Sequence, residues 1–300
     1  MKNLLSIFAF VLCAGFVSCS EEYDADTAVS HYQPLPGKRL VSSVKTTFTT
    51  NGGEDVHEHN FTYDAKNRIK AVRSNIVVHT SVIVNNGGFK DTIPTYCNLA
   101  SGADYFYRGE ELEVAYTVSV DYPEFPGMNS YTSGSHYGNF KSTGVLNRFS
   151  QVSFEYSSTR LQQAYVDGGT CFNLTRDGDG NITGYKKYNT YTDQVYENCQ
   201  GRYHYHPIRN KTNFDFSAYF GYWGVEQGVP LIGIPYRAPY QLAAFGMIGE
   251  TCRNLPFGVI EKNDAGEDEK VYGEWELDSQ DYPLSYVDTD GRKTVITYCK

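Results

Sequence analysis

Two pairs of histidines have the spacing of metal ligands. His57 and His59 are separated by one residue, as are His204 and His206, so each pair projects to one face of a β-strand. A zinc site needs further ligands, and nothing in the sequence brings the two pairs together. Histidines on a solvated strand face are the commoner arrangement. We therefore expect no metal site.

An acidic segment, Asp-Gly-Asp-Gly-Asn at residues 177–181, begins like a calcium-binding loop. A loop of the EF-hand type requires Gly at its sixth position and Glu at its twelfth, which here are Ile182 and Tyr188. We interpret the segment as a turn between strands. The sequence also lacks G-x-S-x-G and H-E-x-x-H motifs. We therefore predict a protein that is not an enzyme and uses no cofactor.

Cys19 has the sequence context of a lipidated cysteine. The apolar residues 4–17 follow a positively charged start, and they are too few to span a bilayer, which takes about 20 residues. Ser18 before Cys19 completes a pattern that resembles a bacterial lipobox, although Phe16 replaces the usual Leu. We expect residues 1–18 to be a signal peptide and Cys19 to carry a lipid anchor. The alternative is ordinary cleavage and release.

The residues after Cys19 predict a tether and a location. Ser-Glu-Glu-Tyr-Asp at residues 20–24 resembles the surface-export signal of Bacteroidota lipoproteins, and a solvated acidic linker is the alternative. We assign residues 19–37 to an acidic, flexible tether. The protein is thus expected to be an outer-membrane lipoprotein, on the cell surface or on the periplasmic face.

The remaining cysteines and the net charge limit the classes of partner. Five cysteines follow Cys19, and Cys171 and Cys199 flank a predicted hairpin, so they could form a disulfide outside the cytosol. The formal charge of the whole chain is −9, with scattered Lys and Arg. Nucleic-acid binding requires clustered positive charge, so we expect no nucleic-acid partner.

Short alternating runs dominate residues 38–300. The chain holds 26 Tyr and 17 Phe, which suit a pleated and half-buried surface. Runs at residues 41–48, 56–63, 76–84 and 112–120 each end at clusters of Gly, Asn, Asp or Pro. We therefore predict a single all-β domain, a strongly curved antiparallel meander that forms an open or partly closed barrel.

A loose repeat marks several of the expected hairpins. Phe-Thr-Tyr-Asp at 61–64, Phe-Glu-Tyr-Ser at 154–157, Leu-Thr-Arg-Asp at 174–177 and Trp-Glu-Leu-Asp at 275–278 each precede a polar turn and a new apolar start. The Asp or Ser can bond to the turn backbone. The units resemble tyrosine-aspartate repeats, but their irregular spacing does not predict a solenoid.

Residues 207–258 form a distinct stretch, low in charge and rich in Gly, Pro and aromatics. Residues 213–220 and 238–245 could each form a short helix. Aromatic rings here could line a ligand pocket, or they could fill the core of the curved sheet. The candidate ligand-binding residues are Tyr219, Tyr222, Trp223, Tyr236, Tyr240 and Phe245.

Three patches resemble a known family. They are Asn-Lys-Thr-Asn-Phe-Asp at 210–215, the segment from Phe245 to Pro256, and the closing hairpin from Tyr282 to Tyr298. Behind a lipoprotein signal, they are similar to a domain-of-unknown-function family of Bacteroidota lipoproteins described as having a porin-like fold. The resemblance implies a curved antiparallel sheet or barrel, sometimes labelled lipid-binding, with no catalytic residue. Residues 75–150 make this chain longer than the family implies.

Three functions remain open at this point. The leading hypothesis is a membrane-tethered, non-enzymatic protein that binds an apolar or amphipathic, lipid-like molecule in a curved sheet. The second is a surface module that binds glycans or proteins through exposed aromatics. The third is a structural subunit of an envelope complex. Aromatic rings on the inner face favour the first hypothesis, and rings on the outer face favour the second.

Overall fold

The computed structural model describes Tyr32 and residues 38–50, 52–86, 89–166, 169–220, 240–262 and 268–300. This part of the chain is almost entirely antiparallel β-structure. Its strands are β1 (Val41–Thr50), β2 (Gly53–Tyr63), β3 (Ile69–Asn86), β4 (Phe89–Arg108), β5 (Glu111–Asp121), β6 (Ser130–Phe140), β7 (Leu146–Phe149), β8 (Val152–Ser157), β9 (Arg160–Val166), β10 (Thr170–Arg176), β11 (Ile182–Asn189), β12 (Val195–Arg209), β13 (Asn254–Lys262), β14 (Asp268–Leu277), β15 (Pro283–Asp288) and β16 (Lys293–Tyr298). The helices are a 3-10 turn, η1 (Pro126–Met128), and two short α-helices, α1 (Phe216–Tyr219) and α2 (Tyr240–Ala244).

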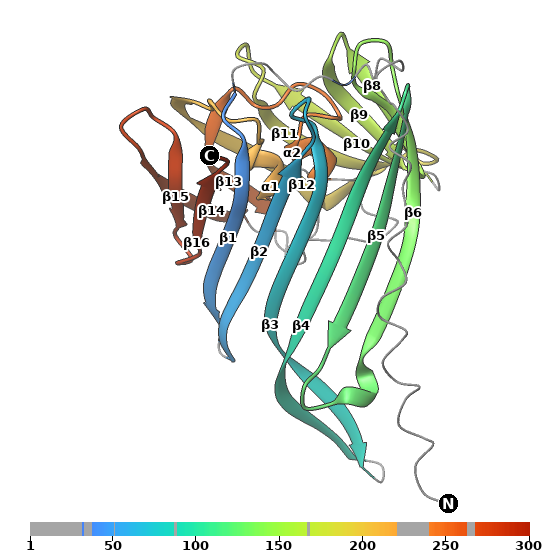
Figure 1. The fold of residues 1–300 in the computed structure, drawn as a ribbon, viewed down its shortest axis with the longest axis vertical. Coiled ribbons are helices and arrows are strands. Elements are labelled where there is room, and N and C mark those ends of the chain that lie inside the picture. The colour runs from blue at the N-terminus through green and yellow to red at the C-terminus, as the bar shows by residue number, and fades with distance from the viewer. Residues whose placement is uncertain are drawn as a thin grey trace, which may run out of the picture.

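Within the described residues, the 16 strands form one closed barrel (Figure 1). Each strand pairs with the next in sequence, and β1 pairs with β16 to close the ring. Val44 lies opposite Ile296 in this closing pair, and both side chains are buried. The antiparallel meander predicted from the sequence is therefore confirmed, and the sheet is fully closed.

The barrel wall is uneven in height because β3 and β4 are much longer than their neighbours. They span 18 and 20 residues, whereas β7 spans four. β2 pairs with β3 only as far as Val77, and β5 pairs with β4 only from Asn98 onward. The rest of β3 and β4 forms a two-stranded hairpin that projects beyond the wall (Figure 1).

Four hairpin turns share one aspartate-centred geometry. In each, the Asp backbone N–H donates to the carbonyl four residues later, and the N–H of that later residue donates back to Asp Oδ1 at 2.9 Å. These two bonds close the turn at the Asp side chain, as the sequence predicted for three of the four. The four are Asp64, Asp177, Asp278 and Asp288.

The third residue after each of these aspartates has a positive φ. Such a left-handed residue lets a short loop match the twist of its two flanking strands. Glycine adopts this conformation at no steric cost, and Asn and Asp tolerate it better than other residues. The four residues are Asn67 (60°), Gly180 (90°), Asp281 (61°) and Gly291 (78°).

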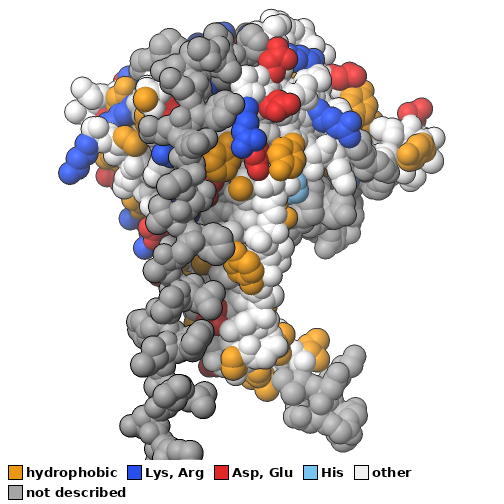
Figure 2. Space-filling model, turned by 45° about the vertical axis from the view of Figure 1, so that its right-hand side comes forward, with side chains coloured by type: hydrophobic (Ala, Val, Ile, Leu, Met, Phe, Trp, Pro, Cys, Tyr) orange, Lys and Arg blue, Asp and Glu red, His pale blue; other side chains and the backbone are white. Residues whose placement is uncertain are grey.

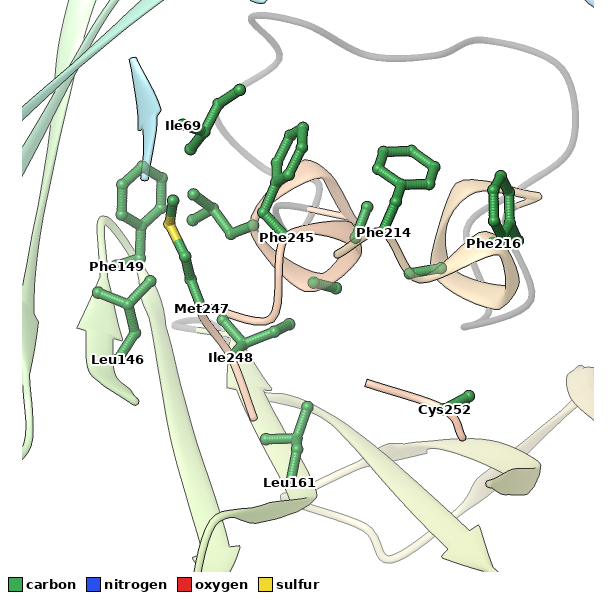
Figure 3. Close-up of a cluster of buried hydrophobic side chains, with 14 of the residues drawn as sticks. Ile69, Leu146, Phe149, Leu161, Phe214, Phe216, Phe245, Met247, Ile248 and Cys252 are labelled. Atoms are coloured by element: carbon green, nitrogen blue, oxygen red, sulfur yellow. The ribbon is translucent and has the colours of Figure 1, made fainter. Parts of the chain in front are cut away.

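The described residues between β12 and β13 fold back into the barrel. We call these residues, 210–220 and 240–253, the plug. Figure 1 shows α1 and α2 between the strands of the wall, and Figure 3 shows Phe214, Phe245 and Met247 lying among inward side chains. The plug therefore fills the lumen at the end where β12 ends, which we call the plug end. The opposite end, where β3 turns into β4, is the far end. The two helices lie inside the ranges predicted for them.

Buried polar bonds hold the plug in place. Asp215 is the N-cap of α1, and its Oδ1 accepts from the backbone of Ser217 and Ala218. Its Oδ2 accepts from the backbone N–H of Cys252 at 2.7 Å, which joins the two halves of the plug. The Asn213 side chain accepts from Val41 N–H and donates to the Tyr63 hydroxyl, which ties the plug to the wall.

Tyr32 is packed in the barrel core, although it lies within residues 19–37, the predicted tether. Its ring is 4% exposed and stacks on Tyr107 and Phe140 at centroid distances of 6.1 and 5.8 Å. Its hydroxyl donates to the Phe245 carbonyl at 2.6 Å. Tyr32 thus binds the N-terminal segment to both the wall and the plug. The signal peptide and Cys19 lie outside the described residues.

Replacing Tyr32 with Ala should remove this packing. We expect Tyr32→Ala to lower the free energy of unfolding by about 3 kcal/mol, the typical cost of deleting a buried aromatic side chain. Tyr191→Ala is the matched control, because Tyr191 is 80% exposed. Urea unfolding followed by fluorescence measures both. Equal stability of the two variants would show that Tyr32 does not belong to the core.

Candidate functional site

The plug covers the inner face of the far half of the barrel only in part. We call Ile76 and Val78 of β3, Cys97 and Leu99 of β4, and Val118 and Val120 of β5 the inner strip. Cross-strand partners project to the same face, and Ile76 lies opposite Leu99, which lies opposite Val120. They share their face with Val72, which is fully buried near the plug. The inner strip is therefore a continuous apolar surface inside the barrel.

Most of the inner strip is only partly buried. Ile76 is 2% exposed, but the other five members keep intermediate exposure although they face the inside of a closed barrel. Solvent therefore reaches apolar wall in this half. Covering such a surface is favourable by roughly 25 cal/mol per Å². The strip can bind an apolar group.

A set of polar side chains borders the inner strip. His59 of β2 lies opposite Ser74 of β3, which lies opposite Ser101 of β4, so the three form one row across the sheet. His57 lies two residues before His59 on β2, opposite Ile76. We call His57, His59 and Ser101 the polar row. It lies on the same inner face as the strip, and next to it.

The polar row contains buried atoms that have no hydrogen-bond partner among the described residues. They are His57 Nε2, His59 Nε2 and Ser101 Oγ. Their residues are 9%, 3% and 7% exposed. A buried polar atom without a partner costs about 1–3 kcal/mol, and native proteins contain few of them. Three on one patch of the inner face indicate a place where a ligand could supply the missing bonds.

His59 is held in position between the wall and the plug. Its Nδ1 bonds to Ser74 Oγ at 2.6 Å, and its ring meets the Tyr219 ring edge-on at 5.7 Å. Burial lowers the pKa of His59 to about 3, with a smaller contribution from His57. The imidazole is therefore neutral at physiological pH. A small void of about 10 Å³ lies beside it, lined also by Phe61 and Phe214.

His57 lies in a different electrostatic environment from His59. Burial lowers its pKa, the nearby Asp55 carboxylate raises it, and Arg292 lowers it. Asp55 is itself only 3% exposed, and its Oδ1 accepts from the backbone N–H of His79 at 2.8 Å, with His79 Nδ1 at the same distance. A carboxyl group is therefore already buried beside His57 on the inner face.

Two of the six candidate ligand-binding residues have described side chains, and both belong to the plug core. Tyr219 packs on Phe214, and its hydroxyl bonds to Thr46 at 3.1 Å. Phe245 is 5% exposed and meets Phe61 edge-on at 5.1 Å. Their rings pack inside the barrel and, together with wall residues, line the void of about 10 Å³. Tyr222, Trp223, Tyr236 and the side chain of Tyr240 lie outside the described residues.

The structure does not support the suggested pairing of Cys171 with Cys199. Cys171 is a free, buried thiol on β10, and Cys199 is on β12, with β11 between them. Strands two apart are separated by about 9.5 Å, which exceeds the roughly 7 Å that a disulfide tolerates between Cα atoms. The hairpin expected between the two cysteines does form, but it places them on non-adjacent strands. The Cys199 side chain is not among those described.

The two histidine pairs lie on opposite faces of the barrel wall. His204 and His206 lie on the outer wall, where His206 meets Phe257 edge-on at 4.8 Å. His57 and His59 were expected on a solvated face, and that expectation was wrong because β2 turns them into the barrel. The sequence offered one signal for this, since Phe61 continues the same alternation. Among the described residues, no group of three His, Cys, Asp or Glu side chains could hold a metal ion.

Comparison with known proteins gives limited similarity. No family model matches the chain, and no curated protein matches it. A porin-like protein of Bacteroides uniformis is similar in structure, with a TM-score of 0.40, 10% identity, and coverage of 87% of this chain and 99% of that one. A porin-like protein of Bacteroides vulgatus has a TM-score of 0.36, 12% identity and the same coverages. None of the described helices is long and apolar enough to cross a membrane.

The low pKa of His59 predicts a pH-dependent stability. Because its folded-state pKa lies below the unfolded value of about 6.5, the unfolded state binds the proton more readily. This stability is complete above pH 6.5 and is lost as the pH falls toward 3, by about 1.4 kcal/mol per pH unit. His59→Asn keeps a hydrogen-bonding group near Nδ1 but does not titrate. Urea unfolding between pH 7 and 4 should show wild type losing stability faster than His59→Asn. Parallel pH profiles would contradict the assignment.

Proposed function

We propose that this protein is a non-enzymatic binding protein that holds a lipid-like, apolar or amphipathic small molecule against the inner strip. The observation that carries the proposal is the partial burial of Val78, Leu99, Val118 and their neighbours inside a closed barrel. The plug covers the apolar wall at one end. A ligand would cover it at the other.

The polarity of the wall supports this proposal. Apolar side chains face inward, while the outer surface has ion pairs such as Arg73–Asp104 at 2.6 Å and Arg108–Glu113 at 3.2 Å. Figure 2 shows charged side chains gathered around the broad plug end, with few on the narrower far half. A barrel that spans the outer membrane has an apolar band outside, whereas outward residues of this half, such as Thr117 of β5, are polar although uncharged. The apolar ligand would therefore lie inside.

The position of the described tryptophan also favours binding inside the barrel. Trp275 is a large aromatic residue, and an outer aromatic platform would require such rings on the outer face. Its ring lies 5.1 Å from Phe216 and 4.8 Å from Tyr286, and its Nε1 donates to the Pro256 carbonyl. The ring thus belongs to the barrel core. The second tryptophan of the chain, Trp223, lies outside the described residues.

We further propose that the barrel is tethered to the outer membrane through Cys19. Cys19 is 13 residues before Tyr32, whose ring is fixed in the core. At about 3.3–3.6 Å per extended residue, that segment reaches at most about 45 Å. Radiolabelled palmitate should be incorporated into the expressed protein, and Cys19→Ser should abolish it.

Changing the inner strip should weaken ligand binding. Leu99→Gln places a polar side chain on the strip, while Ala100→Gln places the same side chain on the exposed outer face, one residue away. Native mass spectrometry of lipid-stripped protein titrated with monoolein should show an affinity at least about tenfold lower for Leu99→Gln, and unchanged binding for Ala100→Gln. Equal effects of both substitutions, or no binding by wild type, would remove the proposal.

A second candidate function is glycan binding on the outer wall. A depression of about 440 Å³ there is lined by Tyr137, Asn139, Arg108, Glu113 and Arg148, among others. Tyr137 is 61% exposed, so its ring is available for stacking on a sugar. The ring beside charged and amide groups has the composition of a carbohydrate subsite.

Glycan binding at Tyr137 can be tested separately from binding in the barrel. Tyr137→Ala should abolish retention on a glycan array, and Tyr191→Ala should leave it intact because Tyr191 lies in the turn between β11 and β12, whereas Tyr137 lies on β6. Monoolein binding should be unaffected by either change. Retention that survives Tyr137→Ala would exclude this site.

A further inference from the structure

The polar row is the feature of the inner face that the inner strip does not explain. Three buried polar atoms, His57 Nε2, His59 Nε2 and Ser101 Oγ, share the barrel's inner face and have no partner among the described residues. Outward residues of the same strands, by contrast, lie at the surface. A ligand made only of hydrocarbon would leave these three atoms without hydrogen bonds.

The row and the strip are arranged in series along the sheet. His57 lies directly opposite Ile76, and Ile76 lies directly opposite Leu99. Ser101 lies two residues from Leu99, on the same face of β4 and toward the plug end. A molecule whose chain lay on the strip would therefore bring its polar end to the row if that end pointed toward the plug.

The charges around the row select the kind of polar end. Asp55 is a buried carboxylate beside His57, so an anionic group would be repelled there. Arg292 also acts on His57. Its guanidinium lies over the Phe48 ring at 5.6 Å and 3.7 Å from Asp290, so its charge already has partners.

A cationic group is also disfavoured at the row. It would have to lose its hydration in a site where both imidazoles are neutral, and desolvating a charge is costly. His79 already supplies the hydrogen bonds to Asp55 Oδ1, through its backbone N–H and its Nδ1. An uncharged group that both donates and accepts avoids these penalties.

We infer that the lipid-like ligand has an uncharged, hydroxyl-bearing head group, as in a monoacylglycerol, that bonds to His57, His59 and Ser101. This inference rests on the proposed function of the inner strip. A neutral imidazole offers one free nitrogen, as donor or acceptor according to its tautomer, and a serine hydroxyl offers both roles. Vicinal hydroxyls and an ester carbonyl offer the donors and acceptors that these three atoms lack.

Three ligands with the same oleoyl-length chain test the head group. Lipid-stripped full-length protein is titrated with monoolein, oleate and oleylamine at pH 7.5 and followed by native mass spectrometry. Monoolein should bind at least about tenfold more tightly than either charged ligand. Tighter or equal binding of oleate or oleylamine would overturn the head-group assignment and leave the inner strip in place. No binding of any of the three would remove both proposals.

Substitutions then locate the head group. Ser101→Ala and His57→Phe each remove hydrogen-bonding atoms while keeping most of the side-chain shape, and each should weaken monoolein binding by about three- to tenfold. Oleate binding should change little. Ser133→Ala and His204→Phe are the matched controls, since both residues are exposed on the outer face. Thermal unfolding verifies that each variant is folded.

The outcome of the variants is decisive for the row. If monoolein binds both variants as tightly as wild type, the head group does not contact the row and the inference is wrong. If the variants weaken monoolein and oleate equally, the substitutions have disturbed the strip and not the head-group contacts, which also contradicts it. In either case the Leu99→Gln result independently reports on the inner strip.

Discussion

A wide barrel with an apolar inner wall must fill its own lumen, and this constraint explains most of the structure. Sixteen strands enclose more space than wall side chains can occupy, and comparable barrels in membranes leave a water-filled channel. Here the inward residues at the plug end are mostly apolar, so water there would be unfavourable. The plug occupies this space instead. Phe214, Phe216, Phe245 and Met247 of the plug are each no more than 5% exposed.

The plug is fixed by directional bonds because hydrophobic contact alone would not set its orientation. Asp215 caps α1 and also bonds to Cys252 N–H, so one side chain defines both halves of the plug. The Asn210 side chain bonds to the Phe214 carbonyl and to Thr212 N–H. The Asn-to-Asp patch at 210–215 therefore acts as a scaffold. Its conspicuous polar residues point to packing inside the barrel, and no chemistry is needed to explain them.

Local features of the sequence predicted the wall well. Alternation located β1, β2, β3 and β5, and the Asp units located the turns at Asp64, Asp177 and Asp278. The turn at Asp288 lies within the predicted closing hairpin from Tyr282 to Tyr298, but no Asp unit was assigned to it. Closure and strand height depend on pairing between distant segments, such as Val44 with Ile296, which no local pattern encodes. The inner placement of His57 and His59 was missed for a related reason, since alternation alone does not say which face becomes the inside.

The candidate site lies away from the residues that the sequence singled out. Aromatic residues of the 207–258 stretch could line a pocket or fill the core, and the two with described side chains, Tyr219 and Phe245, pack in the plug core. The partly buried apolar surface lies on β3–β5, in the region that makes this chain longer than the family resemblance implied. Two consecutive long strands extend the wall there beyond the reach of the plug. A sequence pattern cannot show this, because it depends on how far the plug extends into the lumen.

The pairing of the first strand with the last has a consequence for how the molecule is made. Val44 and Ile296 can meet only after nearly the whole chain has left the ribosome. Until then, β1 and the most recently formed strand both present open edges, which readily pair with other chains. Contacts so distant in sequence also form slowly. Successful assembly should therefore depend on chaperones that shield strand edges, more than on the final stability of the closed ring.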